Sequence, residues 1–248
     1  MRVRRLLALA LLPLLPRLAR GEELMLAAAA SLTDALQEVC RPWQERTGTT
    51  VRFDFGATSA LARQIREGAP ADVFFSADRE HMQELEAAGM VAPGARREVL
   101  SNVLVIVVPS GSTRAIRKPA DLASLSHVAL ADPESVPAGV YARKYLQSVG
   151  MWEAVRERVV PTLDVRAALA AVEGEHADAA IVYRTDAALS RRVRVAFEVP
   201  RADGPEIVYT VAPLASAKPA ARDLVRYLTS PEARAVYGRY GFVVLGGT

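Results

Sequence analysis

The chain has 248 residues, of which 51% are hydrophobic and 24% are charged, so it can bury the core of one large domain or two small ones. Its formal net charge is +3, but five of its 31 basic residues and none of its 28 acidic residues lie in residues 1–21. The rest of the chain is slightly acidic, which removes the electrostatic basis for a nucleic-acid partner. A single cysteine, Cys40, excludes a disulfide within the chain.

The first 21 residues have the pattern of a secretory signal peptide. A basic start at residues 2–5 precedes an apolar run, Leu6 to Leu15, and the small residues Ala19 and Gly21 lie where a signal peptidase cuts. The apolar run is short and is interrupted by Pro13, which disfavours a membrane-spanning helix. We therefore predict cleavage after Gly21 and a periplasmic location. Because no cysteine follows the apolar run at the cut, we expect no lipid anchor.

From residue 22 onward, short apolar runs alternate with segments whose apolar residues recur at helical spacing. The run Val103–Val108 is apolar without a break, which is typical of a strand covered on both faces. Cys40 falls on the apolar face of the first expected helix, so we expect its thiol to be buried. The expected strands are 24–28, 51–55, 71–78, 103–108, 128–131, 179–183, 193–199 and 207–213. The expected helices are 31–47, one from Thr58 to a stop at Gly68, 79–88, 140–149, 152–159, 164–172, 220–228 and one that begins at Ser230.

Strands that alternate with helices predict an α/β fold with mainly parallel sheets. In such sheets, ligands bind where the carboxyl ends of strands meet the amino ends of helices. Small or hydroxyl-bearing residues lie at four such places, which are Ala27–Ser31, Gly56–Ser59, Pro137–Gly139 and Asp164–Val165. These four helix starts are the candidate binding positions.

Ser31 begins the first of these helices. The stretch Ser31-Leu32-Thr33-Asp34 fits a capping box, which predicts Ser31 as the helix N-cap. The alanines at 27–30 would let a ligand approach the backbone, or would pack a helix tightly on a sheet. The first amides of a helix lack internal acceptors and lie at the positive end of its dipole. Several helix starts that face one point would bind an anion without Lys or Arg, whereas for any one alone an ordinary cap is the favoured interpretation, because Ser, Thr and Asp are the commonest caps.

The sequence predicts neither an enzyme nor a metal site. His81, His127 and His176 are isolated, and none has a second ligand at metal-binding spacing. The GATSA stretch at 56–60 lacks the second glycine of a nucleophile elbow, and the sequence contains no phosphate-binding glycine loop. A serine hydrolase would also need a partnered base, and an esterase assay would test that alternative.

Six blocks of sequence carry a resemblance to a known family. In chain order they read AAASLTDAL, SALARQIREGAPADVFFSAD, DPESVPAGVYARKYL, DVRAAL, AAIVYRTDA and RYGF, and the match covers nearly all of residues 24–245. They resemble the periplasmic molybdate-binding proteins of ABC importers. The resemblance implies a two-lobed periplasmic binding protein of type II, an α/β fold in which each lobe is a mainly parallel sheet flanked by helices and the ligand lies in a cleft between the lobes.

The same resemblance implies how the chain is divided and what it binds. Two strands would cross between the lobes, so that lobe I comprises residues 22–104 and 212–248 and lobe II comprises residues 105–211. The implied ligand is molybdate or tungstate, the implied partner is the membrane permease of an ABC importer, and we expect a monomer. No cofactor and no direct protein–metal ligand are expected, because molybdenum would be bound as its oxyanion.

The resemblance also carries the family's oxyanion donors onto this chain. All are uncharged groups, namely the hydroxyl and N–H of Ser31, the hydroxyl at Thr58, the N–H groups of Ala138 and Val165, and the phenol of Tyr183. The family commonly has serine where this chain has Ala57-Thr58-Ser59, so the side-chain contact is assigned to either Thr58 or Ser59. A binder of sulfate, phosphate or another small anion is the nearest alternative. A ligand-sensing regulator would need a DNA-binding segment where this chain has a signal peptide.

Overall fold

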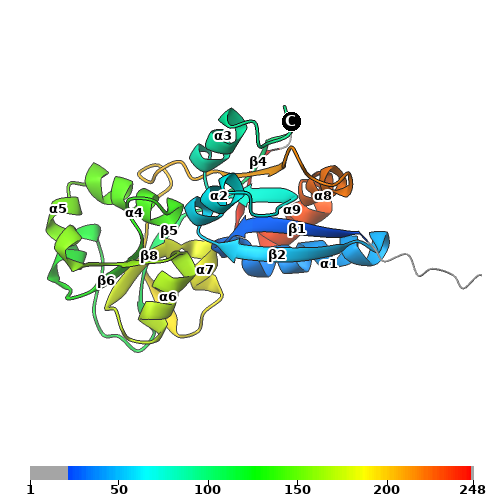
Figure 1. Cartoon of the computed structure of the whole chain (residues 1–248). Helices are drawn as coiled ribbons and strands as arrows, with labels where there is room; N and C mark the ends of the chain where they lie inside the picture. Colours follow the sequence, from blue (N-terminus) through cyan, green and yellow to red (C-terminus); the bar gives the residue numbers. More distant parts are fainter. Residues whose placement is uncertain (1–21, 247–248) are drawn as a thin grey trace, which may run out of the picture.

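The computed structural model describes residues 22–246, so the predicted signal peptide lies outside the described residues. The described chain forms two lobes that lie side by side in Figure 1, each with one β-sheet and flanking helices. The expected two-lobed α/β fold is therefore confirmed. Within residues 22–246, no helix has both the length and the apolar character that crossing a membrane requires.

The sheet of lobe I has six strands in the order β11-β4-β10-β3-β1-β2. β1 runs parallel to β2 and β3, whereas β10 runs antiparallel to β3 and β4, and β11 runs antiparallel to β4. The strands are β1 (Glu23–Ala29), β2 (Thr50–Gly56), β3 (Val73–Ser76), β4 (Arg97–Ser101), β10 (Tyr209–Pro213) and β11 (Val243–Val244).

The sheet of lobe II has five strands in the order β7-β6-β8-β5-β9. β6 runs parallel to β7 and β8, whereas β5 runs antiparallel to β8 and β9. β5 lies inside this sheet and its apolar run is buried, as expected for a strand covered on both faces. The strands are β5 (Leu104–Pro109), β6 (Val128–Ala131), β7 (Val159–Thr162), β8 (Ala179–Tyr183) and β9 (Val193–Glu198).

Both sheets are mixed, so the expectation of mainly parallel sheets is wrong in this detail. The reason lies in β5 and β10, which carry the chain from one lobe into the other. Leu104 of β5 pairs with Tyr183, the last residue of β8, and Thr210 of β10 pairs with Ser76, the last residue of β3. Each crossing strand enters its sheet at the edge where the parallel strands end, so it must run in the opposite direction.

The strands also locate the two crossings between the lobes. The chain passes from the first sheet to the second between Ser101 and Leu104, and it returns between Glu198 and Tyr209. The division expected from the sequence placed residues up to 104 in lobe I and residues up to 211 in lobe II. We propose that the lobes divide inside these two segments instead, because strand pairing assigns Leu104 to the second sheet and Tyr209 to the first.

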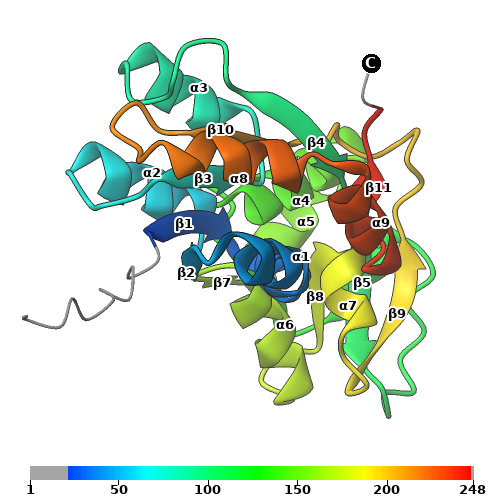
Figure 2. The same cartoon turned by 90° about the vertical axis from the view of Figure 1, so that its right-hand side faces the viewer.

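Helices cover both faces of the lobe I sheet. Neighbouring residues of a strand point to opposite faces, so Phe75 packs in the core with α1, α8 and α9, whereas Phe74 packs with α2 and α3. Figure 2 shows α1, α8 and α9 together on one face. Cys40 in α1 is fully buried as predicted, and burial raises the pKa of its thiol to about 12. The helices are α1 (Thr33–Thr47), α2 (Thr58–Arg66), α3 (Glu80–Ala87), α4 (Pro137–Ser148), α5 (Trp152–Val155), α6 (Val165–Glu173), α7 (Arg184–Ala188), α8 (Ala220–Leu228) and α9 (Pro231–Arg239).

Candidate functional site

A small cavity lies between the lobes and takes its lining from both. Its empty volume is about 230 Å³. Five of the six residues expected at the binding site line this cavity, and Ser59 does not. The lining residues are Ala29–Ser31, Gly56–Thr58, Ala77, Val136–Ala138, Asp164, Val165 and Tyr183.

Four of the lining segments are helix starts that directly or closely follow a strand. The turn of 3-10 helix at Ala30–Leu32 follows β1, α2 follows β2, α4 follows β6, and α6 follows β7. Thr58 and Val165 are the first residues of their helices, and Ala138 is the second residue of its helix. The amides of a first helical turn have no acceptor inside the helix and carry partial positive charge. The cavity therefore gathers free N–H groups from two lobes.

Ser31 does not cap its helix, so that prediction is wrong. Helix α1 begins at Thr33 without a side-chain cap, and the Thr33 hydroxyl donates to the Ala30 carbonyl at 2.8 Å. The Ser31 hydroxyl lies 2.9 Å from the phenol oxygen of Tyr209, which comes from β10. A partner contributed by a distant strand thus replaces the local capping bond, and it holds Ser31, which is 4% exposed, at the cavity wall.

Thr58 lines the cavity with a hydroxyl that is already used as an acceptor. The side chain is 1% exposed, and Thr58 Oγ1 accepts a hydrogen bond from the N–H of Ala77 at 3.0 Å. A hydroxyl has one hydrogen to donate in addition to its acceptor sites, so the hydrogen of Thr58 is still free. Ser59 is half-buried and lies outside the lining. The geometry therefore favours Thr58 over Ser59 for a side-chain contact.

Gly139 explains how α4 comes so close to the end of β6. A Cβ atom at this position would lie 1.9 Å from the carbonyl oxygen of Ala131 and 2.6 Å from that of Asp132. Only glycine permits this approach of helix to strand. The proline at the first position of α4 costs no hydrogen bond, because that N–H would have no helical partner. Together these residues place Ala138 against the cavity.

Tyr183 brings an unpartnered hydroxyl to the site. It is the last residue of β8 and is 1% exposed, and its phenol oxygen has no hydrogen-bond partner among residues 22–246. Burial raises the pKa of Tyr183 well above its usual value of 10, so the phenol keeps its hydrogen. A buried polar group without a partner costs roughly 1–3 kcal/mol, which a ligand that accepts from it would recover.

The charges around the cavity are already paired. Asp164 is the one charged residue among the described lining residues, and its carboxylate accepts from the N–H of Ala167 at 2.9 Å as the N-cap of α6. Arg166, next to Val165, donates to Asp34 at 2.7 Å and to Asp186 at 2.5 Å. Asp186 is fully buried, and burial raises the pKa of its carboxyl to about 6. The cavity itself thus offers uncharged donors.

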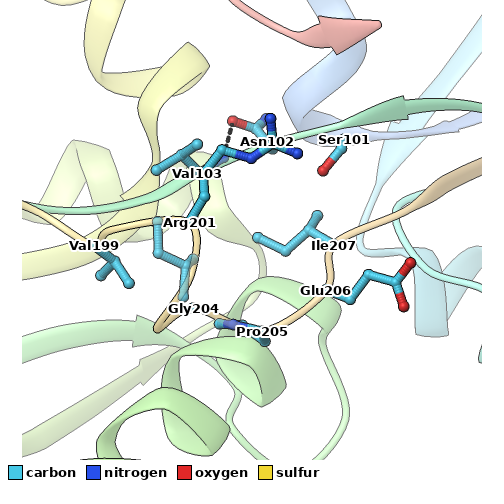
Figure 3. A pocket seen from close by; sticks show the side chains of 10 residues that line it. Ser101, Asn102, Val103, Val199, Arg201, Gly204, Pro205, Glu206 and Ile207 are labelled. Atoms are coloured by element: carbon cyan, nitrogen blue, oxygen red, sulfur yellow. Dashed lines mark hydrogen bonds between the residues drawn. The ribbon is translucent and has the colours of Figure 1, made fainter. Parts of the chain in front are cut away.

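Other parts of the described chain do not compete for this role. Within residues 22–246, no group of three or more His, Cys, Asp and Glu side chains is arranged to hold a metal ion. A hollow with an empty volume of about 520 Å³ lies between the two crossing segments, and its lining includes Asn102, Glu206 and Ile207 (Figure 3). It is lined by strand ends, a turn and irregular chain, and no helix begins among its lining residues.

Two α/β lobes that are joined by two crossings and share a small cavity of hydrogen-bond donors define a two-lobed solute-binding protein. The chain belongs to the family described as bacterial extracellular solute-binding protein, whose sequence profile matches residues 24–243.

The similarity to individual proteins extends over most of the chain. The protein named molybdate-binding protein ModA of Escherichia coli (strain K12) is 37% identical over 224 residues, which cover 88% of this chain and 87% of that protein. Its namesake in Haemophilus influenzae is 36% identical over 222 residues and covers 87% of each chain. The solved periplasmic molybdate-binding protein of Azotobacter vinelandii has a TM-score of 0.79 at 22% identity, covers 90% of this chain and 100% of its own, and supports the fold.

Proposed function

We propose that the protein binds molybdate or tungstate outside the cytoplasm and delivers it to the membrane permease of an ABC importer. The observation that carries the proposal is the meeting of Ser31, Thr58, Ala138, Val165 and Tyr183 around one small cavity. They come from separate segments of the chain and from both lobes. The names of the similar proteins supply the particular ligand.

The chemistry of the cavity fits a tetrahedral dianion. Molybdate presents oxygen acceptors and no hydrogen, and the cavity presents helix amides, two hydroxyls and a phenol. Each hydrogen bond to a charged group contributes roughly 1.5–3 kcal/mol. Several such bonds, after the costs of association and lobe closure, correspond to an affinity in the micromolar to nanomolar range.

The same donor set discriminates against a protonated anion. At neutral pH, phosphate usually carries one hydrogen, which needs an acceptor in the site. In a ring of donors that hydrogen would face another donor, at a cost of roughly 1–3 kcal/mol. Sulfate has the charge and shape of molybdate but is smaller, so its rejection depends on the spacing of the donors.

The proposal includes a periplasmic location after removal of residues 1–21 by signal peptidase, and a monomer that performs no chemical reaction. The pattern of basic, apolar and small residues at the amino terminus supports export. The family supports an extracellular place of action.

Calorimetry with the processed chain, residues 22–248, tests the function. Molybdate should bind near one-to-one, and sulfate and phosphate should compete only at far higher concentrations. Equal affinities for molybdate and sulfate would reject the assignment in favour of a general oxyanion binder. Titration with tungstate under the same conditions measures the preference between the two oxyanions.

A further inference from the structure

Asn102 lies at the first crossing between the lobes, and its amide orientation is fixed by its neighbour. The residue is 4% exposed, and its side-chain carbonyl accepts from the N–H of Val103 at 2.9 Å, the dashed line in Figure 3. A backbone N–H can only donate, so the atom facing Val103 must be the oxygen. The side-chain NH₂ group therefore faces the opposite direction.

That NH₂ group donates to residues from both lobes. Its nitrogen lies 2.9 Å from the hydroxyl of Thr185 in α7 and 3.3 Å from the phenol oxygen of Tyr209 in β10. Both partners are buried, at 2% and 0% exposure. Because an amide nitrogen has hydrogens and no acceptor site, Tyr209 must be the acceptor in this bond.

Tyr209 then has its own hydrogen left to donate. Burial raises the pKa of this phenol above its usual value of 10, so the hydrogen is retained. The remaining partner of the Tyr209 hydroxyl in the described chain is Ser31 Oγ at 2.9 Å. Donation from Tyr209 to Ser31 is the arrangement that gives the buried Tyr209 hydrogen a partner, and it leaves the hydrogen of the Ser31 hydroxyl free at the cavity.

Thr58 has the same arrangement, but its donor is a backbone N–H and not a side chain. Its oxygen accepts from the N–H of Ala77, which can only donate, so the Thr58 hydrogen is also free. Both hydroxyls of the cavity wall thus accept one hydrogen bond from the protein, which orients them with the hydrogen left for the cavity. This common feature suggests that the direction of these hydrogen bonds, and not only the presence of a hydroxyl, matters for the ligand.

We propose that Asn102 and Tyr209 are positioning residues that fix the Ser31 hydroxyl as a donor and thereby determine selectivity for oxyanions without a hydrogen. The inference rests on the proposed function and deepens it. With Ser31 held as a donor, a fully deprotonated anion gains a hydrogen bond, and a protonated anion meets a second donor. Without Tyr209, the Ser31 hydroxyl loses the hydrogen bond that orients it and can turn its oxygen towards a hydrogen on the ligand, so the protonated anion is no longer penalised there.

The test is a double-mutant cycle with two ligands. Tyr209→Phe, Ser31→Ala and the double variant are titrated with molybdate, and with phosphate in competition, at neutral pH. Tyr237→Phe is the matched control, because Tyr237 is also fully buried against Phe242 and its hydroxyl has no partner within residues 22–246. Thermal unfolding of each variant shows whether it is folded.

We expect Tyr209→Phe to lower the molybdate-to-phosphate affinity ratio about tenfold, through loss of one directed hydrogen bond, and Tyr237→Phe to leave the ratio unchanged. Ser31→Ala should weaken molybdate binding about tenfold, and adding Tyr209→Phe to it should change binding less than about twofold, because Tyr209 acts through Ser31. If Tyr209→Phe does not fold, Asn102→Ala replaces it, since losing the amide donor lets the phenol accept from Ser31. That variant should lower the same ratio.

The outcomes separate the two proposals. A parallel loss of both affinities in Tyr209→Phe, or an undiminished effect in the Ser31→Ala background, would overturn the positioning role while leaving the proposed function in place. A wild-type protein that binds no oxyanion would reject the proposed function and the positioning role together.

Discussion

Arg166 in α6 of lobe II donates a hydrogen bond to Asp34 in α1 of lobe I, with 2.7 Å between nitrogen and oxygen. The same guanidinium holds Asp186 of α7 at 2.5 Å. Val165, next to Arg166, lines the cavity, and so does Ser31, which lies one helical turn before Asp34. The ion pair therefore joins the lobes directly behind the candidate ligand site.

Asp34→Asn should weaken oxyanion binding and speed dissociation. The carboxylate is 42% exposed, so the pair is screened, and its loss should cost up to about 1 kcal/mol, or about fivefold in affinity. Calorimetry and stopped-flow dissociation at low and high salt would measure both effects, with the difference from wild type shrinking as salt rises. Asp223→Asn, which breaks a pair within α8, is the control. An affinity equal to that of wild type would show that the pair does not hold the lobes together.

Asp186 should make the stability of the protein depend on pH in mildly acidic solution. Burial raises its pKa from 3.8 to about 6, so between these values the folded protein binds a proton that the unfolded chain does not. This contribution is complete below about pH 4 and is lost as the pH rises through about 6. The Asp186→Asn variant lacks this pH-dependent stabilisation. The difference in unfolding free energy, wild type minus variant, should therefore fall as the pH rises from about 4 to about 6. Urea denaturation followed by the fluorescence of Trp43 and Trp152 measures it, and a rise with pH would contradict the assignment.

Tyr183→Phe should make the ligand-free protein more stable and its binding of the ligand weaker. Removing a buried hydroxyl that has no partner should raise the unfolding free energy by about 1 kcal/mol, whereas the ligand loses a donor and should dissociate faster. Thermal unfolding without ligand and dissociation kinetics with molybdate test the two effects. Tyr237→Phe, which removes another unpartnered hydroxyl away from the cavity lining, should raise stability without changing the dissociation rate. A destabilised Tyr183→Phe protein would mean that the hydroxyl has a partner in solution.

Gly139→Ala should displace the start of α4 from the cavity. The new methyl group would overlap the Ala131 carbonyl, and relieving such overpacking costs typically about 1–3 kcal/mol and moves the backbone. We expect lower thermal stability and at least about tenfold weaker molybdate binding, because the amide of Ala138 moves with the helix. Gly238→Ala is the control, since Gly238 lies in α9 with open space at its Cβ position and should gain about 0.5–1 kcal/mol. Normal binding by Gly139→Ala would exclude this role for the helix start.

Local signals were sufficient for most of the elements around the site. Strands β6 and β8 and helix α8 have the predicted bounds, and Ser230 caps α9 by accepting from the N–H of Ala233, as its Ser-Pro start predicts. Strand β7 was missed because it is largely exposed and contains Pro161, so it lacks an apolar run. Strand β11 has only two residues, too few for any pattern.

The errors at the site have a different cause, which is distance along the chain. A capping box reports only neighbours, whereas the partner of Ser31 is Tyr209, 178 residues later. Asn102 and Tyr209 were missed for the same reason, since no short motif contains both. The choice between Thr58 and Ser59 is open in the sequence because both carry a hydroxyl where the family commonly has serine, and sequence does not fix which of two successive helical residues faces the cavity.

The position of β10 between β4 and β3 determines which of the two sheets can be completed first while the chain is being synthesised. Until residues 209–213 emerge, β1, β2 and β3 can pair but one edge of β3 stays open, and β4 has neither of its neighbours, because β11 follows β10 in the chain. The five-stranded sheet needs nothing beyond Glu198. Unpaired edges invite aggregation during synthesis, so the half of the molecule that begins first is finished last and has the greater need of chaperones.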